Sequence, residues 1–311
     1  MNFQQLRIIR EAVQRNFNLT EVAAALFTSQ SGVSKHIKDL EDELGVELFV
    51  RRGKRLLGLT EPGKELAVIV ERMLLDARNI KRLAEQFSGA EQGRLTIATT
   101  HTQARYALPQ VVARFKAAFP KVHLVLHQGS PAEIVALLQS GEADIGIATE
   151  ALREVEQFVT FPFYDWHHAV VVPEGHALAQ AGELSLEALA EHPLITYHEG
   201  YTGRARIDAS FAAAGLAPDI VMSALDADVI KTYVQVGLGV GIIAAMAFEP
   251  QRDQGLQLLG ADHLFRANTT RIALKRGHYL RGFAYRFLQE CGGELSEERV
   301  RQALEGGSGA A

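Results

Sequence analysis

Polar and basic side chains that could bind nucleic acid follow a helical spacing between residues 28 and 38 of this 311-residue chain. Four apolar residues recur beside them at four- and three-residue steps and predict one buried stripe of a helix: Val33, Ile37, Leu40 and Leu44. The polar side chains then lie on the exposed face, where hydroxyl, amide and ammonium groups can reach base edges and phosphates. The candidates on this segment are Thr28, Ser29, Gln30, Ser31, Ser34, Lys35 and Lys38.

A basic cluster follows this helix. The segment ELFVRRGKRLLGL, residues 47–59, is typical of a β-hairpin with Gly53 at its tip. Four side chains of this hairpin could grip the phosphate backbone or the minor groove: Arg51, Arg52, Lys54 and Arg55. A helical hairpin that touches no nucleic acid would show the same apolar pattern, but the basic cluster beside it favours DNA binding. With an earlier helix that carries Phe3, Leu6, Ile9 and Val13, the pattern predicts a winged helix-turn-helix over residues 1–59.

Small neutral polar residues mark a second candidate site, at the ends of predicted strands. TTHTQ, residues 99–103, follows an apolar run and leads into a helical segment. Hydroxyl and amide groups beside the backbone N–H groups of a helix start suit a small oxyanion without a fixed positive charge. Any one of these residues could simply cap a helix, so the prediction rests on several converging at one cleft. The candidates are Thr99, Thr100, Thr102, Gln103, Gln128, Ser130, Thr149, Trp166, Tyr201 and Thr202.

Alternating strands and helices are the elements that would position these groups. From Arg94 onward, short β-branched runs alternate with helical segments, which is typical of an α/β fold. The strand TTRIALK is expected to return to the first sheet, with crossovers near 149–164 and near Asn268. This predicts two lobes, with a ligand between them at the ends of the strands. The boundaries expected are about 90–163 with 269–295 for lobe I and about 164–268 for lobe II, followed by a C-terminal helix and flexible tail over 296–311.

A long helix is expected between these two parts, over residues 60–89. Thr60, Glu61 and Pro62 form a helix start, and Ser88-Gly89 and Gln92-Gly93 mark its end. Apolar residues follow a heptad pattern along it, which predicts a dimerisation seam: Leu66, Val70, Met73, Ala77, Ile80, Ala84 and Phe87. The alternative is a helix that packs on its own domain.

Composition restricts the functional classes. Residues 1–65 hold 10 Lys and Arg against 9 Asp and Glu, so one DNA-binding head would bind weakly and strong binding would require several copies. Cys291 is the only cysteine, which excludes an intrachain disulfide. The sequence carries no GxSxG, P-loop or GxGxxG motif, so we expect no catalytic residue and no enzymatic activity. The single cysteine and the spacing of the histidine pairs His123/His127 and His167/His168 on predicted strands predict no metal site. Without a signal peptide or a membrane span of roughly 20 apolar residues, the protein is expected to be cytoplasmic, with no membrane partner.

The segment SQSGVSKHIKDLEDELGVELFVRRGKRLLGLTEPG resembles the DNA-binding head of LysR-type transcriptional regulators. Further segments are similar to the sulfur-assimilation (CysB/Cbl) branch of that family: TTHTQARYALP, HQGSP, DADVIKTYV and GLGVGIIA. The resemblance covers the chain from Phe3 to about Phe287. It implies a two-lobed effector domain with a periplasmic-binding-protein-like fold, over residues 90–295.

The resemblance also implies partners and ligands. It implies a mainly activating, cytoplasmic regulator that binds double-stranded promoter DNA as a homodimer or homotetramer and acts with RNA polymerase. No cofactor is expected; a small anionic effector is, with sulfate, an acetylserine-type ligand or adenosine phosphosulfate as candidates. By motif match, five residues should line the effector site: Thr100, Thr102, Gln103, Thr149 and Thr202. The alternatives are a regulator of another pathway, or a cytoplasmic small-molecule-binding protein or enzyme whose head contacts a protein.

Overall fold

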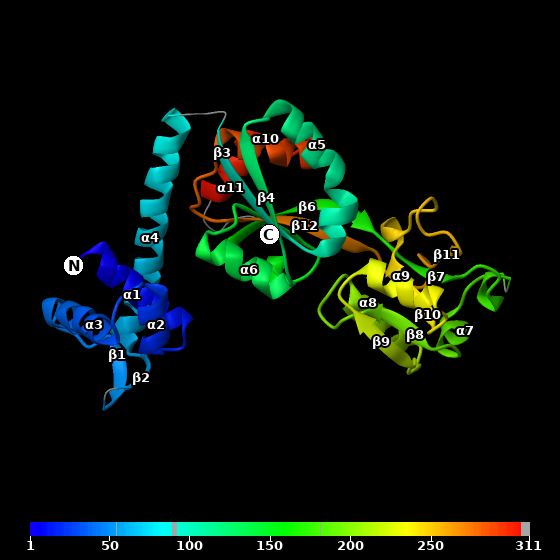
Figure 1. Cartoon of the computed structure of the whole chain (residues 1–311), viewed down its shortest axis with the longest axis horizontal. Helices are drawn as coiled ribbons and strands as arrows, with labels where there is room; N and C mark the ends of the chain where they lie inside the picture. The colour runs from blue at the N-terminus through cyan, green and yellow to red at the C-terminus, as the bar shows by residue number, and fades with distance from the viewer. Residues whose placement is uncertain (54, 89–91, 181, 306–311) are drawn as a thin grey trace. The chain divides into compact units, whose positions relative to one another are not determined.

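The computed structural model describes residues 1–311 except 54, 89–91, 181 and 306–311 (Figure 1). The chain divides into two compact units, Met1–Ala84 and Glu85–Ala311, and each is described by itself. Most of the expected flexible tail lies in the last of the excluded ranges. Lys54, and Gly89 at the expected end of the long helix, also lie outside the described residues.

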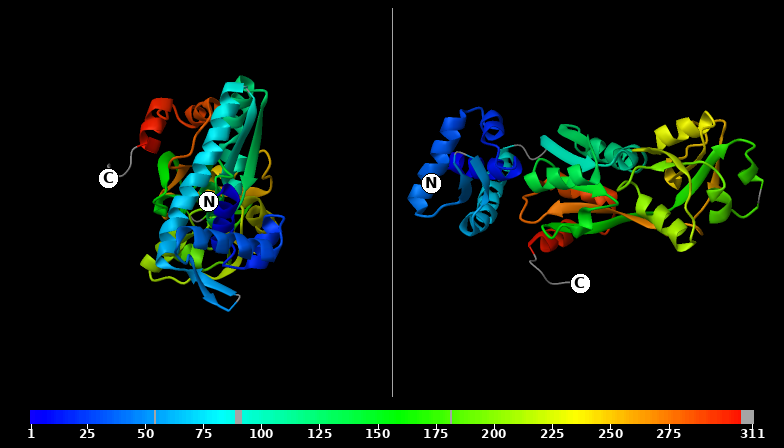
Figure 2. Two further views of the ribbon diagram at one scale, coloured as in Figure 1. Left: turned by 90° about the vertical axis from the view of Figure 1, so that its left-hand side faces the viewer. Right: turned by 90° about the horizontal axis from the view of Figure 1, so that it is seen from below.

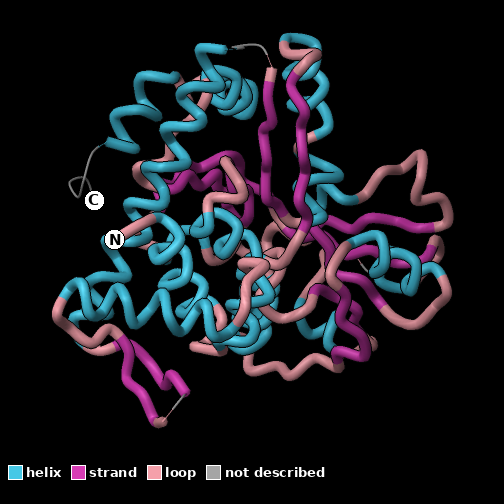
Figure 3. The backbone as a smooth tube through the Cα atoms, turned by 60° about the vertical axis from the view of Figure 1, so that its left-hand side comes forward, coloured by secondary structure: helices cyan, strands magenta, loops and turns pink. Residues whose placement is uncertain are grey.

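The first unit is a head of three short helices and a hairpin, α1 (Phe3–Gln14), α2 (Leu19–Ala25), α3 (Gln30–Leu44), β1 (Phe49–Arg52) and β2 (Arg55–Leu59). A short polar side chain begins each helix by accepting a backbone N–H: Asn2 from Gln5, Asn18 from Thr20 and Ser29 from Gly32. Gly45, with a φ of 69°, ends α3 in the left-handed region. Figure 3 shows the β1–β2 hairpin projecting from the helices.

The buried apolar stripes of α1 and α3 are shorter than the spacing of their apolar residues suggests. Val33, Ile37 and Leu40 are buried, whereas Leu44 is 41% exposed because it lies at the end of α3, beyond the core that α1 and α2 cover. On α1, Leu6 and Ile9 are buried, but the end residues Phe3 and Val13 are exposed. Periodicity thus located the buried face of each helix but not its ends.

The long helix α4 (Glu61–Ser88) begins where the sequence predicted. The Thr60 hydroxyl accepts the N–H of Gly63 at 3.1 Å and donates to the carbonyl of Glu47 at 2.7 Å, so it joins the helix start to the head. A Cβ at Gly63 would lie 2.0 Å from the carbonyl oxygen of Leu48, so only glycine allows this close approach. Leu66, Val70 and Met73 pack on the core of the head. This part of α4 therefore packs on its own domain, which was the alternative to a dimerisation seam.

The second unit contains two five-stranded sheets (Figures 1 and 2). We call the first sheet and its helices lobe I. Its strand order is β4-β3-β5-β12-β6, from β3 (Gly93–Thr99), β4 (Val122–Gln128), β5 (Ile145–Ala148), β6 (Phe158–Trp166) and β12 (Asn268–Lys275). One face packs on α5 (Pro109–Ala118), α10 (Gly282–Cys291) and α11 (Glu297–Glu305), and the other on α6 (Pro131–Ser140).

We call the second sheet and its helices lobe II. Its order is β11-β7-β10-β8-β9, from β7 (His168–Pro173), β8 (Leu194–Tyr197), β9 (Ile220–Ala224), β10 (Val240–Ala244) and β11 (Leu256–Gly260). On one face pack α7 (Leu186–Ala190) and α8 (Arg204–Ala213), and on the other α9 (Ala227–Gln235). Because helices cover both faces of each sheet, the middle strands β5 and β10 are apolar and buried along their whole length.

The chain passes between the lobes twice. The first crossover was expected near 149–164, but residues 158–166 form β6 and pair with β12 in lobe I, so the first passage is at His167. The second runs from β11 to β12, which returns to the first sheet as expected and lies antiparallel to both β5 and β6. Both passages place polar residues at the junction of the lobes.

Candidate functional site

The polar face of α3 is exposed. Thr28, Ser29, Gln30, Ser31, Lys35 and Lys38 are exposed, and Ser34 is half-buried. The Ser29 hydroxyl caps the helix and lies 3.1 Å from the hydroxyl of Ser31, so the first turn presents two linked hydroxyls. A capped helix start of this kind, with lysines one and two turns further on, can contact phosphates at its end and base edges along its face.

The hairpin divides its arginines between two tasks. Arg51 donates to the Glu41 carboxylate at 2.5 Å, and the same carboxylate accepts the N–H groups of Leu48 and Phe49. Arg51 therefore ties the hairpin to the end of α3. Arg52 and Arg55 face each other across the hairpin next to its tip and are exposed. Lys54 lies outside the described residues.

One exposed aromatic residue was not anticipated from the sequence. Phe27 lies in the turn between α2 and α3, has a left-handed φ of 51°, and is 97% exposed. An apolar ring in this position gains nothing from the head's own core. Its place directly before Thr28 was the available signal, because a large aromatic residue is unusual in a tight polar turn.

The threonine-rich segment lies where β3 ends and a π-helical turn, η1 (Gln103–Ala107), begins. The wide turn is closed by the Leu108 N–H and the carbonyl of Gln103 at 3.0 Å. Such turns recur at functional sites because they change which side chains face inward. Thr100, Thr102 and Gln103 are all buried here.

Thr102 carries the clearest sign of a ligand site. Its buried hydroxyl has no hydrogen-bond partner among the described residues. The neighbouring Gln103 is engaged, because its side-chain carbonyl accepts the hydroxyl of Tyr164. Buried hydroxyl groups in proteins are nearly always hydrogen-bonded, so Thr102 has an unused bond to offer.

Lobe II contributes a strained turn at the same junction. Thr202 is buried and has a φ of 43°, an unusual conformation for a β-branched residue. Its carbonyl accepts the Nε2–H of His168 at 3.1 Å. A Cβ at Gly203 would come within 2.7 Å of both His168 and Asn268, so this turn packs tightly against the returning strand.

Lobe I groups form hydrogen bonds with one another and, through Glu150, with this turn. The Thr149 hydroxyl lies 3.3 Å from that of Thr270, which also accepts the indole N–H of Trp166 at 3.1 Å. The Glu150 carboxylate accepts the N–H of Gly203 across the junction, and its second oxygen is buried without a partner among the described residues.

Four predicted residues have simpler roles in the structure. The Thr99 hydroxyl donates to the carbonyl of Ile147 within the sheet, and Ser130 caps α6 by accepting the N–H of Glu133. Gln128 is exposed at the end of β4. Tyr201 packs on the apolar core of lobe II.

A second network crosses the junction and was missed by sequence reasoning. Tyr106 of η1 donates to Asp228 of α9 at 2.7 Å, and Asp228 also pairs with Arg105 at 2.7 Å and Lys231 at 3.4 Å. Asp226 caps α9 by accepting the N–H of Val229 at 2.9 Å, whereas Asp228 joins the two lobes.

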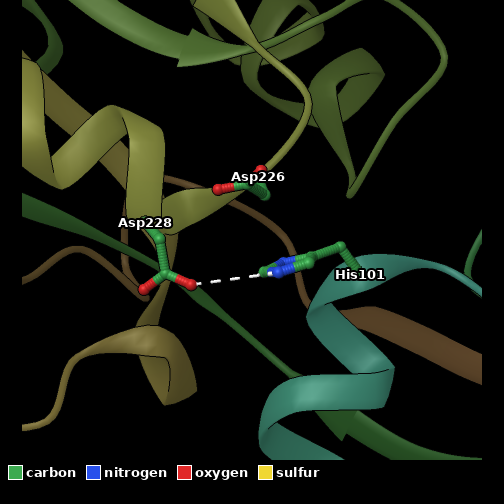
Figure 4. A group of neighbouring side chains, drawn as sticks. All are labelled: His101, Asp226 and Asp228. Atoms are coloured by element: carbon green, nitrogen blue, oxygen red, sulfur yellow. Dashed lines mark ion pairs between the residues drawn. The ribbon is translucent and has the colours of Figure 1, made fainter. Parts of the chain in front are cut away.

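These aspartates also approach His101, so the group has the residue types of a metal site (Figure 4). The His101 Nε2 lies 4.0 Å from Asp228. Arg105 and Lys231 already neutralise Asp228, and their positive charges disfavour a cation at this position. The network therefore acts as a polar link between lobes.

Burial sets the charge of the groups around Thr102 and Thr202. It raises the pKa of Glu150 to about 7 and lowers the pKa of His168 to about 4, so His168 stays neutral and donates to Thr202. Burial also raises the pKa of Tyr164 to about 12, which keeps its hydroxyl as a donor to Gln103. The two hydrogen-bond donors His168 and Tyr164 are thus neutral.

Comparisons with known proteins decide the family. The model described as the LysR substrate binding domain matches residues 88–296, and the model described as the bacterial regulatory helix-turn-helix protein, lysR family, matches residues 3–64. The chain belongs to the LysR family. The predicted winged helix-turn-helix, long helix and two-lobed periplasmic-binding-protein-like domain are confirmed.

Curated LysR relatives match this chain over nearly its whole length. It is 59% identical over 304 residues to the HTH-type transcriptional regulator SsuR of Burkholderia cenocepacia, which covers 98% of this chain and 99% of SsuR. It is 58% identical over 306 residues to the HTH-type transcriptional regulator cbl of Escherichia coli, covering 98% and 97%. These relatives are named as transcriptional regulators, which confirms the expectation of a non-enzymatic protein.

Solved LysR structures agree. The cofactor-binding domain of the Cbl transcriptional regulator matches with a TM-score of 0.67 and 53% identity, over 69% of this chain and 95% of that one. A full-length OxyR variant from Pseudomonas aeruginosa matches with a TM-score of 0.65 at 22% identity, over 94% of each chain, and shares the fold. No helix among the described residues is long and apolar enough to cross a membrane.

Proposed function

We propose that this LysR-type protein is a ligand-controlled regulator, mainly an activator, of genes for sulfur assimilation. Its effector is a small anion of sulfur metabolism that binds between the lobes of the second unit. Two of its relatives, cbl and the 52% identical CysB of Burkholderia cenocepacia, belong to the branch that the sequence motifs resemble. Sulfate, an acetylserine-type compound and adenosine phosphosulfate are the candidate effectors.

The unpartnered hydroxyl of Thr102 is the observation that carries the effector site. A sulfate or carboxylate oxygen would accept this hydroxyl's proton and supply the missing hydrogen bond. Thr100, Thr149 and Thr202 lie on the segments that meet at the same junction and offer further hydroxyls. Neutral donors suit a doubly charged oxyanion, because each bond to a charged acceptor is stronger than a bond between neutral groups.

Glu150 is compatible with an anion at this junction. An ionised carboxylate would repel it, but with a pKa of about 7 Glu150 holds its proton on roughly half of the molecules at neutral pH. A bound anion would raise that pKa further and so favour the protonated acid.

Self-association is the second part of the proposal. Apolar side chains of lobe II are exposed along α9 and the flanking β9 strand and loops: Val221, Leu225, Val229, Tyr233 and Val236. On α4, Ile80 is 68% exposed and Phe87 85% exposed, beyond the residues that pack on the head. Neighbouring exposed apolar side chains are typical of interfaces. A homodimer or homotetramer would present paired heads to double-stranded promoter DNA in the cytoplasm, and RNA polymerase is the proposed further partner.

A matched pair of substitutions tests the effector site. Titration calorimetry of the full-length protein with sulfate, acetylserine and adenosine phosphosulfate measures which one binds. Thr102→Ala should weaken that binding at least tenfold. Ser130→Ala removes a hydroxyl that caps α6, so it should leave the affinity unchanged and cost about 1 kcal/mol of stability. Equal affinities of the two variants would contradict the proposed site.

A further inference from the structure

A hollow of about 800 Å³ lies at the junction of the lobes and gathers four arginines. They come from four different segments. Arg153 belongs to the short turn η2 (Leu152–Glu154), Arg206 to α8, and Arg271 to β12, while Arg266 lies in the loop before that strand. None of the proposed effector-site hydroxyls except that of Thr149 lines this hollow.

These arginines have no carboxylate partner among the described residues. None of the ion pairs of the described chain includes any of the four, although most other guanidinium groups of the second unit are paired. Asp208, on the same helix as Arg206, pairs with Arg204 at 2.7 Å. Glu150 and Glu154 also line the hollow, which leaves an excess of positive charge even when both are ionised.

Unpaired charges of one sign, converging on a concave surface, concentrate the electrostatic potential there and attract a counter-ion. Guanidinium groups donate two parallel hydrogen bonds to phosphate, sulfate or carboxylate oxygens, and several of them can hold a ligand with more than one acidic group. The volume is in the range of small-molecule sites.

The lining of the hollow also has an apolar part. Ala205, Ala209 and Ala213 recur at four-residue steps on α8, so they form a strip of methyl groups along one face of that helix. A strip without long side chains can accommodate the flat body of an organic ligand.

We propose that this hollow is a second ligand site, for a small organic polyanion that carries two or more phosphate or sulfate groups. The four arginines hold the acidic groups and the alanine strip of α8 contacts the organic body. The hollow does not include Thr100, Thr102 or Thr202 of the proposed effector site, and it adjoins that site at Thr149. It shares Thr149, Glu150 and Gly203 with the junction, so its occupant would contact both lobes at once.

The test uses the full-length protein without DNA, with inorganic pyrophosphate and ADP as probes in titration calorimetry. We expect one saturable site per chain, with ADP bound more tightly than pyrophosphate because of the alanine strip. Arg206→Gln should weaken both at least fivefold, and Arg206→Gln with Arg271→Gln at least tenfold. Arg206 is exposed, so the single variant should fold even if the half-buried Arg271 proves necessary for stability.

Three control variants separate this site from the other places where an anion could bind. Arg252→Gln changes an exposed arginine of lobe II outside the hollow, Arg55→Gln changes the hairpin of the head, and Thr102→Ala changes the effector site. Each should leave the probe affinity within twofold. Absence of saturable binding, or loss of binding in Arg55→Gln or Thr102→Ala, overturns the proposal. It is also overturned if Arg206→Gln weakens only promoter binding, since the arginines would then contact DNA.

Discussion

Glu150 is a carboxylic acid at a position that disfavours its charge. One oxygen accepts the N–H of Gly203, while the other is buried without a partner among the described residues. Burial raises its pKa from 4.5 to about 7, so the folded chain keeps a proton that the unfolded chain has lost. The residue therefore makes stability depend on pH.

The expected dependence has a definite sign. Below pH 4.5 both states are protonated and Glu150 has no cost. Between pH 4.5 and 7 the unfolded state ionises first, so the folded state loses relative stability, and above pH 7 the cost is constant at roughly 3 kcal/mol. Glu150→Gln keeps an acceptor for Gly203 and cannot ionise. Thermal unfolding should therefore show that the variant gains stability over the wild type at pH 8 but not at pH 4.5.

If the wild type and Glu150→Gln differed in stability by the same amount at pH 8 and at pH 4.5, Glu150 would have an ordinary pKa in the folded chain. His168→Asn serves as a contrast, because the pKa of His168 is lowered, to about 4. As pH falls from 6.5 towards 4, the unfolded chain protonates His168 before the folded chain does, so the folded state loses stability. This is the opposite pH dependence to that of Glu150.

At the scale of elements, the hairpin depends on α3 for its position. The Glu41 carboxylate near the end of α3 accepts two backbone N–H groups at the start of β1 and the guanidinium of Arg51. The basic residues that were predicted as one DNA-binding group therefore separate into a structural arginine, Arg51, and two exposed ones, Arg52 and Arg55. Spacing alone could not distinguish them, because the partner of Arg51 lies ten residues earlier.

This division predicts different phenotypes for neighbouring arginines. Arg55→Gln should leave the melting temperature unchanged and reduce the slope of log affinity for promoter DNA against log salt concentration by about 0.9 for each head that binds. Arg51→Gln should lower the melting temperature, because a buried carboxylate loses its charged partner. Thermal unfolding and a salt titration of promoter binding measure both. A normal melting temperature for Arg51→Gln would contradict the structural assignment.

The sequence predicted most of the elements because their patterns are local. The helix starts at Ser29 and Thr60 and the α/β alternation follow from caps and periodicity. β6 was missed because Pro162 interrupts its pattern, which the sheet tolerates since β6 is an edge strand. In the candidate site, Thr102 was predicted by residue type, whereas the roles of Tyr106 and Asp228 were not, because they depend on contacts between residues 122 positions apart.

At the scale of the whole molecule, the two units must be coupled if an effector is to control transcription. A ligand can shift the protein only by the difference in its affinity for two states. Glu150 and the Tyr106–Asp228 bond join the lobes directly, so an effector between the lobes would change how they are held. The sequence predicted this division between a DNA-binding head and a sensor. The coupling between them is a free energy, which binding measurements can determine.

Reciprocity makes the coupling measurable from both sides. If the effector changes promoter affinity by some factor, promoter DNA must change effector affinity by the same factor. We expect calorimetry with and without promoter DNA, and promoter binding with and without the effector, to give one shared factor of about 5 to 150. Thr102→Ala should bring both factors to about one. It should leave promoter affinity without effector within a few-fold of the wild-type value, because the substitution lies in the second unit and the head has its own core. If Thr102→Ala instead abolished promoter binding without effector, the threonine would be required for the DNA-binding state itself, and sensing and DNA binding would not be separate tasks of the two units.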